Sequence, residues 1–156
     1  MTFLQKFLTL VGRVVYWIGW PVWHVLLKNS RRSRIFVVSD DEVLLVRPYL
    51  GSGAWGLPGG GMRRAEDPKN GAARELFEEV GICVRPEQLV DLGEHKTSYH
   101  GHSYLGYFYA LRLQKKPTLK IQLHEIAGGR WFPLDVVEKI ADQPSLRLAF
   151  EAWQKS

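Results

Sequence analysis

Apolar and polar positions follow several different rhythms along this chain, and each rhythm predicts a kind of element. Two apolar runs, IFVVS and VLLVR, flank the pair Asp40-Asp41, and short β-branched runs joined by such a turn are typical of a β-hairpin. Strand-like runs recur at CVRP, HSYLGYFYALRL and TLKIQL. The last two segments, PLDVVEKIAD and PSLRLAFEAW, have the spacing of amphipathic helices. This order of elements predicts an α/β or α+β sandwich of sheet and helices.

The helix predicted over residues 68–80 has the clearest boundaries in the sequence. Asp67 is placed as its N-cap, Pro68 suits the first helical position, and Gly81 suits its termination. Four apolar positions share one face of this helix and are expected to point toward a core: Ala72, Ala73, Leu76 and Val80.

An apolar stretch at residues 7–27, FLTLVGRVVYWIGWPVWHVLL, precedes all of these elements. A helix of that length would be ~31 Å long at ~1.5 Å per residue, which is just enough to cross a bilayer. Arg13, Gly19 and Pro21 argue against a clean span, and the tryptophans of the run favour the membrane interface. The basic residues within positions 28–34 would hold the C-terminal side in the cytoplasm.

Residues 1–33 are therefore interpreted as an apolar helical extension with a basic flank, which attaches a cytoplasmic protein to the cytoplasmic face of a membrane. The alternative is that this segment packs on the domain or forms an oligomer contact. Residues 34–156 are predicted to form one globular domain. A chain of 156 residues can bury one sizeable core, and 46% apolar with 24% charged residues is the composition of an ordinary folded domain.

Charge and cysteine content narrow the classes of partner and site. The net charge of +5 favours contact with anions, whether phosphate compounds, nucleic acid or an acidic membrane surface. No segment interleaves basic and aromatic residues as an RNA-binding module does, so no specific nucleic-acid partner is expected. The single cysteine, Cys83, excludes an internal disulfide and a cysteine-rich zinc site. Because it follows the apolar end of the predicted helix, we expect it to be a small core residue.

Three carboxylates, Glu75, Glu78 and Glu79, lie on adjoining turns of the helix at 68–80. Two such charges ~4 Å apart in a partly desolvated cleft repel by ~4 kcal/mol at an effective dielectric of 20. A divalent cation would offset this repulsion, and oxygen-only ligands favour Mg²⁺ or Mn²⁺ over zinc. Arg74, four residues before Glu78, can hold a carboxylate in a metal-binding rotamer. Taken alone, the cluster would more often be a solvated acidic helix face with one ion pair.

The residues before the helix reverse those odds. Positions 60–82 match the pattern G-x5-E-x7-R-E-U-x-E-E-x-G-U, with U a bulky aliphatic residue, at every defined position. With each letter expected about one time in fifteen, seven fixed letters coincide by chance on the order of once per 10⁸ positions. The chain thus resembles the Nudix hydrolase family, and the resemblance extends from the hairpin to Glu125 and Trp131. The fixed letters are Gly60, Glu66, Arg74, Glu75, Glu78, Glu79 and Gly81.

The resemblance implies a fold and a metal site. The fold would be a Nudix-like α/β/α sandwich with a mixed sheet. The carboxylates of Glu75, Glu78 and Glu79 would bind Mg²⁺ or Mn²⁺ with the help of a backbone carbonyl near Gly60, and Glu66 would be a supporting carboxylate. Arg74 keeps the orienting role that its spacing suggests.

Further residues are candidates for proton transfer and substrate binding. The resemblance leaves two candidates for the general base, Glu79 on the helix and Glu125 in the segment HEIAGGRW. Arg47 and Arg63 flank the Gly-rich loop and are candidate phosphate-binding residues. The glycines at 59–61 are expected to adopt unusual φ angles and to let the backbone approach the metal.

The expected activity is attack of water on one phosphorus of a diphosphate, by a Mg²⁺-dependent pyrophosphohydrolase. Its substrate would be a nucleoside diphosphate derivative, such as a nucleotide sugar, a dinucleotide or a nucleoside triphosphate. Two alternatives stay open. One is a membrane-tethered hydrolase of a lipid diphosphate, suggested by residues 7–27, and the other is a non-catalytic nucleotide-sensing module.

Overall fold

The N-terminal segment lies largely outside the part of the chain that the computed structural model describes. The part of the predicted extension before Ser30, including the apolar stretch at 7–27, therefore stays a prediction. Among the described residues, no helix combines the length and the apolar character that crossing a bilayer requires. The structure describes residues 11, 14, 30–49, 53–99, 102–122, 125–140 and 144–156.

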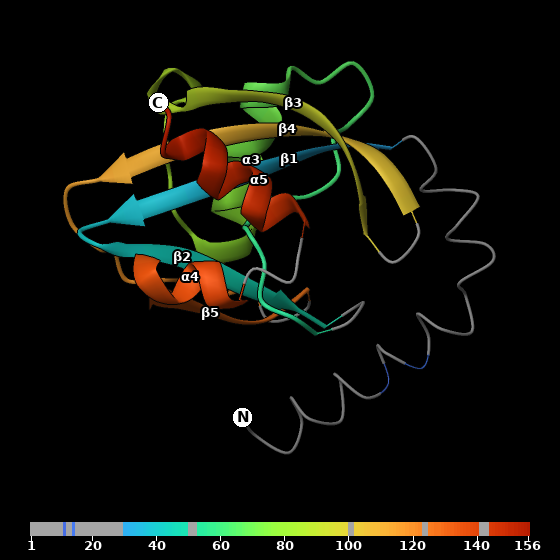
Figure 1. Cartoon of the computed structure of the whole chain (residues 1–156). Coiled ribbons are helices and arrows are strands. Elements are labelled where there is room, and N and C mark those ends of the chain that lie inside the picture. The colour runs from blue at the N-terminus through green and yellow to red at the C-terminus, as the bar shows by residue number, and fades with distance from the viewer. Residues whose placement is uncertain are drawn as a thin grey trace.

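One mixed sheet forms the centre of the described chain (Figure 1), with its five strands in the order β3-β4-β1-β2-β5. β1 runs parallel to β4 over ten paired residues, whereas the β1–β2, β2–β5 and β3–β4 pairs are antiparallel. The hairpin predicted around Asp40-Asp41 is confirmed as β1 and β2. The strands are β1 (Ser30–Ser39), β2 (Glu42–Pro48), β3 (Val90–Tyr99), β4 (His102–Leu113) and β5 (Ile126–Pro133).

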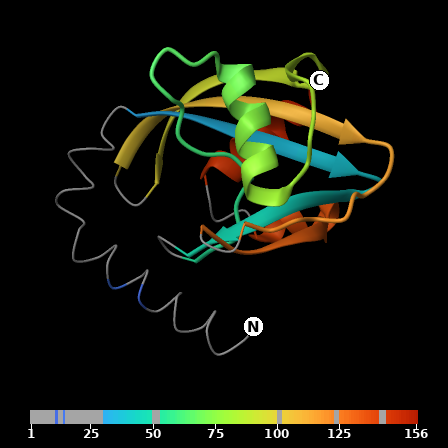
Figure 2. The same ribbon diagram turned by 180° about the vertical axis from the view of Figure 1, so that it is seen from behind.

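Helices cover both faces of this sheet, which confirms the predicted α/β/α sandwich. Helix α3 (Pro68–Val80) lies on one face, seen in front of the sheet in Figure 2. Helices α4 (Leu134–Ile140) and α5 (Pro144–Trp153) lie on the other, seen in front in Figure 1. Successive strand residues point to opposite faces of the sheet and form one apolar core on each face. Ile35 packs with Leu76 on the α3 side, and Phe36 packs on the α5 side.

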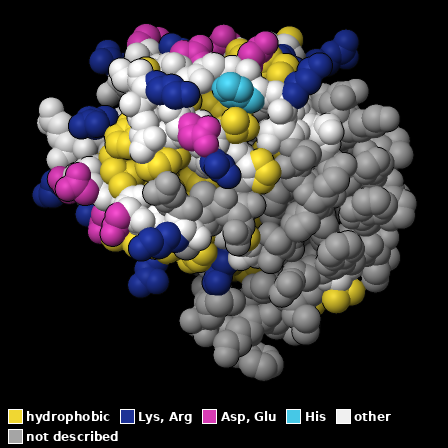
Figure 3. Space-filling model, viewed as in Figure 1, with side chains coloured by type: hydrophobic (Ala, Val, Ile, Leu, Met, Phe, Trp, Pro, Cys, Tyr) yellow, Lys and Arg dark blue, Asp and Glu magenta, His cyan; other side chains and the backbone are white. Residues whose placement is uncertain are grey.

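The α5 face has a mixed surface. Lysine and arginine side chains are interspersed there with acidic ones around an apolar area (Figure 3). Within its described part, this face therefore does not concentrate the net charge of +5 into one basic surface.

At the end of the sheet away from the Asp40-Asp41 turn, the Gly-rich loop lies between β1 and β2. The β1–β2 pairing covers only the positions next to the turn, Val38↔Val43 and Ser39↔Glu42. Farther along, the backbone N–H groups of Ser33 and Ile35 donate to the carbonyls of Gly60 and Pro58, both at 3.0 Å. The Gly-rich loop thus takes the place of a strand beside β1, immediately before α3 begins.

Several predicted element boundaries are wrong. CVRP leads into the short 3-10 helix η1 (Pro86–Gln88) instead of forming a strand. Residues 118–122 of TLKIQL also form no strand, because the N–H groups of Lys120 and Gln122 donate to the carbonyls of Val80 and Glu79 at the end of α3. β1 begins at Ser30, five residues before the expected strand start at Ile35, so part of the supposed basic flank belongs to the sheet. Cys83 is exposed and not a core residue.

Candidate metal centre and active site

Helix α3 is fixed at both ends by the residues that its sequence predicts. The Asp67 side chain accepts hydrogen bonds from the backbone N–H groups of Lys69 and Asn70, at 3.0 and 3.1 Å, as an N-cap does. Gly81 adopts the left-handed conformation with φ +74°, and its N–H donates to the Phe77 carbonyl. These caps set where the helix starts and stops, and therefore which residues face the loop.

Packing fixes the rotation of α3 about its axis. Ala72, Leu76 and Val80 are completely buried against the sheet. The same burial carries two carboxylates inward, because Glu75 is 9% exposed and Glu79 is 7% exposed. Acidic residues are rarely this buried without a partner, so their surroundings decide what the site can do.

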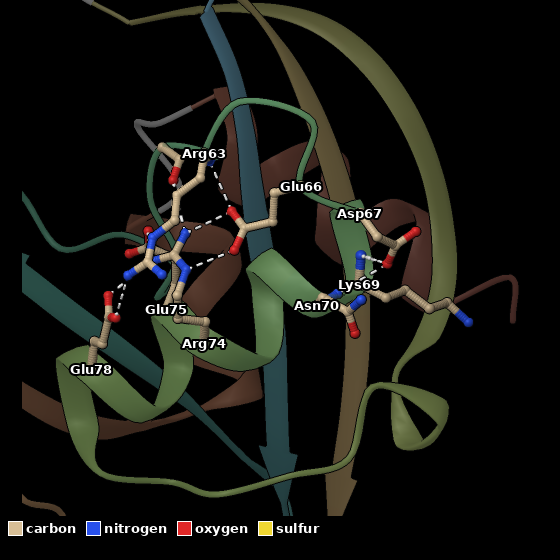
Figure 4. Close-up of polar contacts among 9 residues, drawn as sticks. Arg63, Glu66, Asp67, Lys69, Asn70, Arg74, Glu75 and Glu78 are labelled. Carbon is tan, nitrogen blue, oxygen red and sulfur yellow. Dashed lines mark hydrogen bonds and ion pairs between the residues drawn. The ribbon is translucent and has the colours of Figure 1, made fainter.

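Arg74 gathers three carboxylates around one guanidinium group (Figure 4). Its Nε and Nη2 donate to the two oxygens of Glu66, at 2.8 and 2.9 Å. Its Nη1 donates to Glu75 Oε1 at 2.7 Å and to Glu78 Oε2 at 2.8 Å. Nη2 also donates to the Gly61 carbonyl at 3.1 Å, which ties the loop to the helix. Arg74 thus holds both the carboxylates and the loop above them.

Glu79 is held by the loop itself. Its Oε2 accepts a hydrogen bond from the backbone N–H of Gly59 at 2.8 Å in a buried environment. The carbonyl of the same glycine accepts a hydrogen bond from Nη1 of Arg34 on β1. Sequence reasoning missed Arg34, because its basic neighbours place it in a basic flank and nothing in its local sequence links it to Glu79.

The pKa values of Glu66, Glu75 and Glu79 are shifted in two opposite directions. The hydrogen bonds from Arg74 hold the pKa of Glu66 at about 2, well below the ordinary carboxyl value. Burial raises the pKa of Glu75, although Arg74 opposes this shift. Burial likewise raises the pKa of Glu79 to about 7, opposed by the Gly59 N–H and the charge of Arg34. The inner pair is thus poorly solvated and gains from an added positive charge.

Two glycines of the loop are required for different physical reasons. A Cβ at Gly60 would lie 2.4 Å from Oε2 of Glu75, so only glycine lets this carboxylate lie against the backbone. Gly59 has φ +126°, and a Cβ there would lie 2.3 Å from the Ser33 carbonyl oxygen. The expectation of unusual φ is therefore met at Gly59 and is wrong for Gly60 and Gly61, and a Cβ at Gly61 would meet open space.

The second candidate for the general base lies outside α3. Glu125 is an exposed turn residue just before β5, and its charge contributes to the raised pKa values of Glu75 and Glu79. Its backbone is fixed by Tyr49, whose N–H donates to the Glu125 carbonyl at 3.0 Å. The structure therefore brings Glu125 into the electrostatic neighbourhood of the inner pair.

The two candidate phosphate-binding arginines contact different groups. Arg63 is exposed, its Nη2 lies 3.1 Å from Glu78 Oε1, and its backbone N–H donates to Glu66. Arg47 lies on β2, with its guanidinium carbon 5.3 Å from the centre of the Trp55 ring. Arg63 thus borders the carboxylate cluster, whereas Arg47 belongs to an aromatic cluster.

The donor atoms of this centre fit a hard divalent cation. Among the described residues, no three acidic, histidine or cysteine side chains are arranged as a ready cage, because Arg74 draws Glu66, Glu75 and Glu78 toward itself. The nearby ligand atoms are all carboxylate or carbonyl oxygens, as Mg²⁺ and Mn²⁺ prefer. The Glu75 carboxylate lies against the backbone at Gly60, in space that a Cβ would fill.

Comparison with known proteins decides the family. A model of the NUDIX domain matches residues 29–153. The chain belongs to the Nudix hydrolase family. Nudix hydrolases are pyrophosphohydrolases that act on diphosphate bonds of nucleoside diphosphate derivatives. A MutT-like protein of Streptomyces ambofaciens is 33% identical over 72% of this chain and 70% of its own length. Nudix hydrolase 2 of Arabidopsis thaliana is 28% identical over 84% of this chain, which spans only 48% of that relative.

Solved Nudix structures share the fold of this Nudix chain. A MutT Nudix hydrolase from Burkholderia pseudomallei has a TM-score of 0.67 at 22% identity, over 80% of this chain and 98% of its own. The NUDIX domain of Shewanella oneidensis NrtR, solved with ADP ribose, has a TM-score of 0.68 at 19% identity, over 81% of this chain and 87% of its own. At these identities the likeness supports the fold, and the site is argued from its own residues.

Proposed function

We propose that this Nudix chain is a Mg²⁺- or Mn²⁺-dependent pyrophosphohydrolase that cleaves a nucleoside diphosphate derivative. The observation that carries the proposal is the carboxylate centre on α3. Two poorly solvated carboxylates, Glu75 and Glu79, lie beside a glycine backbone, and Arg74 orients Glu75 together with Glu66 and Glu78. A merely structural acidic face would be solvated, and it would not need a glycine against Glu75.

The ligands bound in structurally similar proteins support the same substrate class. The Shewanella NUDIX domain was solved with ADP ribose. A bifunctional protein from Francisella tularensis, with ADP ribose pyrophosphatase as one activity, was solved with AMP and a manganese ion. Its TM-score is 0.69 at 20% identity, over 88% of this chain and 46% of its own. Nucleotides with a diphosphate linkage are therefore the first substrates to test.

In the proposed reaction, water attacks one phosphorus of the substrate and the bridging P–O bond breaks. The residues that would hold the cation are Glu75, Glu78 and Glu79, with the Gly60 carbonyl. The bound cation would neutralise phosphate oxygens and lower the pKa of water. Arg74 holds Glu75 and Glu78 in place through the bonds described above. Such electrostatic positioning supplies most of the catalysis in phosphoryl transfer.

Two carboxylates are candidates for accepting the proton of the attacking water. Glu79 is buried, and its Oε2 accepts a hydrogen bond from the Gly59 N–H. Glu125 is exposed and lies at the edge of the same centre. We propose that the two act jointly, with Glu79 closer to the cation and Glu125 exchanging protons with solvent.

The test is a substrate panel with the full-length chain, measured by phosphate release with a coupled phosphatase where the product requires it. The panel contains ADP ribose, a diadenosine polyphosphate, a nucleoside triphosphate, a prenyl diphosphate and a diphosphoinositol phosphate. We expect turnover of a nucleoside diphosphate derivative that needs Mg²⁺ or Mn²⁺ and stops with EDTA. Cleavage confined to prenyl diphosphate would replace the proposal with the lipid-directed alternative. Binding of a nucleotide without any hydrolysis would replace it with the sensing module.

Membrane attachment through residues 7–27 is proposed separately, because all of these residues except 11 and 14 lie outside those that the structure describes. The proposed catalysis needs nothing from them: the hairpin, the pattern at residues 60–82 (the Nudix box) and Glu125 all follow Asn29. The segment would therefore set where the enzyme works, and not which bond it cleaves.

A further inference from the structure

Arg34 lies on β1, outside the Nudix box, yet its side chain contacts the loop that carries the site. Its Nη1 donates a hydrogen bond to the carbonyl of Gly59. The N–H of the same glycine donates to Glu79 Oε2 at 2.8 Å. Gly59 thus accepts a hydrogen bond from Arg34 through its carbonyl and donates one to the buried Glu79 carboxylate through its N–H.

Gly59 is well suited to transmit a constraint, because it has little freedom to adjust. Its φ of +126° is a conformation that other residues rarely adopt, and its Cα lies so close to β1 that a Cβ would meet the Ser33 carbonyl. Backbone hydrogen bonds from Ser33 to Gly60 and from Ile35 to Pro58 fix the residues on both sides. The N–H and the carbonyl of Gly59 belong to successive peptide groups that meet at its Cα, so a displacement of the carbonyl that shifts this Cα also moves the N–H relative to Glu79.

The guanidinium group of Arg34 is itself held in place. Tyr104 on β4 is 5% exposed, and its ring centre lies 6.0 Å from the guanidinium carbon of Arg34 and 5.6 Å from that of Arg32. Both arginines alternate with the inward-facing Ser33, so they share one face of β1. Arg32 is thus a neighbour with the same charge, the same strand face and the same aromatic contact.

Two arginines therefore divide the carboxylates of the site between them. Arg74 binds Glu66, Glu75 and Glu78 directly. We propose that Arg34 is the positioning residue for Glu79, which it holds through the Gly59 backbone. This inference rests on the proposed function of the site, in which Glu79 is a metal ligand and takes part in proton transfer.

The first test measures the link without metal or substrate, as the hydrogen-exchange rate of the Gly59 amide by NMR with EDTA present. We expect Arg34→Gln to speed this exchange by about tenfold or more, because the amide loses its fixed partner. Arg32→Gln is the matched control and should leave the rate within about twofold. Arg34→Lys keeps the charge without the planar fork and should fall between the two. Equal rates in all four proteins would overturn the proposal.

The second test measures Mn²⁺ affinity by electron paramagnetic resonance of the free ion, and kcat and KM on the best substrate of the panel. Arg34→Gln should weaken Mn²⁺ binding and lower kcat by about 10–100-fold, the range for losing a residue that orients a ligand. KM should stay within about threefold, because the substrate is not contacted. Arg34→Lys should recover part of both losses, and Arg32→Gln should match the wild type.

The outcomes separate this proposal from the proposed function. A wild-type chain that binds Mn²⁺ but hydrolyses no diphosphate contradicts the function, while the Gly59 exchange rate and the Mn²⁺ affinity still decide the role of Arg34. An active wild type with equal Mn²⁺ affinity and kcat in Arg34→Gln and Arg32→Gln contradicts the role of Arg34 alone. If Arg34→Gln does not fold, judged by urea unfolding, Arg34→Lys decides both tests against the same control.

Discussion

The burial of Glu79 predicts how the stability of the metal-free chain changes with pH. Its pKa is raised from 4.5 to about 7 by burial in the folded protein. A group whose folded pKa exceeds its unfolded value contributes stability below the unfolded pKa and loses it as pH rises through the folded pKa. The free energy of unfolding should therefore fall between about pH 4.5 and 7 on account of this one carboxyl group.

The size of this effect follows from the shift. Each pKa unit corresponds to about 1.4 kcal/mol, so ionised Glu79 costs the folded state about 3 kcal/mol above pH 7. Glu79→Gln removes the charge and keeps an acceptor for the Gly59 N–H. We expect the variant to be more stable than the wild type at pH 8 by up to about 3 kcal/mol, and nearly equal to it at pH 5.

Urea unfolding followed by tryptophan fluorescence, with EDTA at pH 5 and pH 8, measures this difference directly. Glu66→Gln is the matched control of opposite sign, because Arg74 lowers the pKa of Glu66 to about 2. Its charge stabilises the folded state at every pH above about 4.5, so this variant should be less stable than the wild type at both values. A stability difference between Glu79→Gln and wild type that is the same at pH 5 and pH 8 would refute the account of Glu79.

Two further predictions concern the loop and the N-terminal segment. Gly60→Ala places a Cβ against the Glu75 carboxylate and should lower Mn²⁺ affinity and turnover by about 10–100-fold. In the control Gly61→Ala the new Cβ meets open space, so both quantities should change far less. Equal losses in the two variants would show that the contact with Glu75 does not matter. Deleting residues 1–29, which ends one residue before β1 at Ser30, should release the protein from the membrane fraction while turnover persists. A full-length chain in the soluble fraction, or a folded but inactive truncation, would contradict the anchor.

Helix α3 could be predicted from the sequence because its signals are local. Asp67, Pro68 and Gly81 mark its ends within a few residues, and the spacing of its apolar positions sets the buried face. The spacing of the Nudix box also fixes the length of the loop between Gly60 and the helix. The placement of Glu75 and Glu79 toward that loop follows from the same periodicity, and their burial is what the structure adds.

The missing prediction of β5 and the wrong prediction of a strand at TLKIQL both concern segments whose conformation depends on contacts between distant parts of the chain. β5 contains Gly128 and Gly129, which are weak strand formers, yet a Cβ at Gly129 would lie 2.6 Å from the Ile121 side chain. Ile121 itself lies in a strand-like run whose backbone instead completes the end of α3. Neither conformation can be predicted from the local sequence, because each segment is stabilised by its contacts with the other.

Arg34 shows the same limit for the site. Its neighbours in sequence are basic, and a basic run beside an apolar segment is typical of a membrane flank. Only the parallel pairing of β1 with β4 and the position of the loop beside β1 place its guanidinium at Gly59. A residue that acts through the backbone of another segment leaves no spacing pattern in the sequence.

The central claim is that the carboxylates of α3 form the metal centre of a diphosphate hydrolase. It is tested most directly by Mn²⁺ affinity and turnover under saturating Mg²⁺ in Glu78→Gln and Glu79→Gln. Glu151→Gln is the control, because Glu151 forms an i,i+4 pair with Arg147 on α5, as Glu78 does with Arg74 on α3. We predict losses greater than about 10–100-fold in the two α3 variants, with the fold retained, and wild-type behaviour in the control. Turnover near the wild-type value in both α3 variants would contradict the claim.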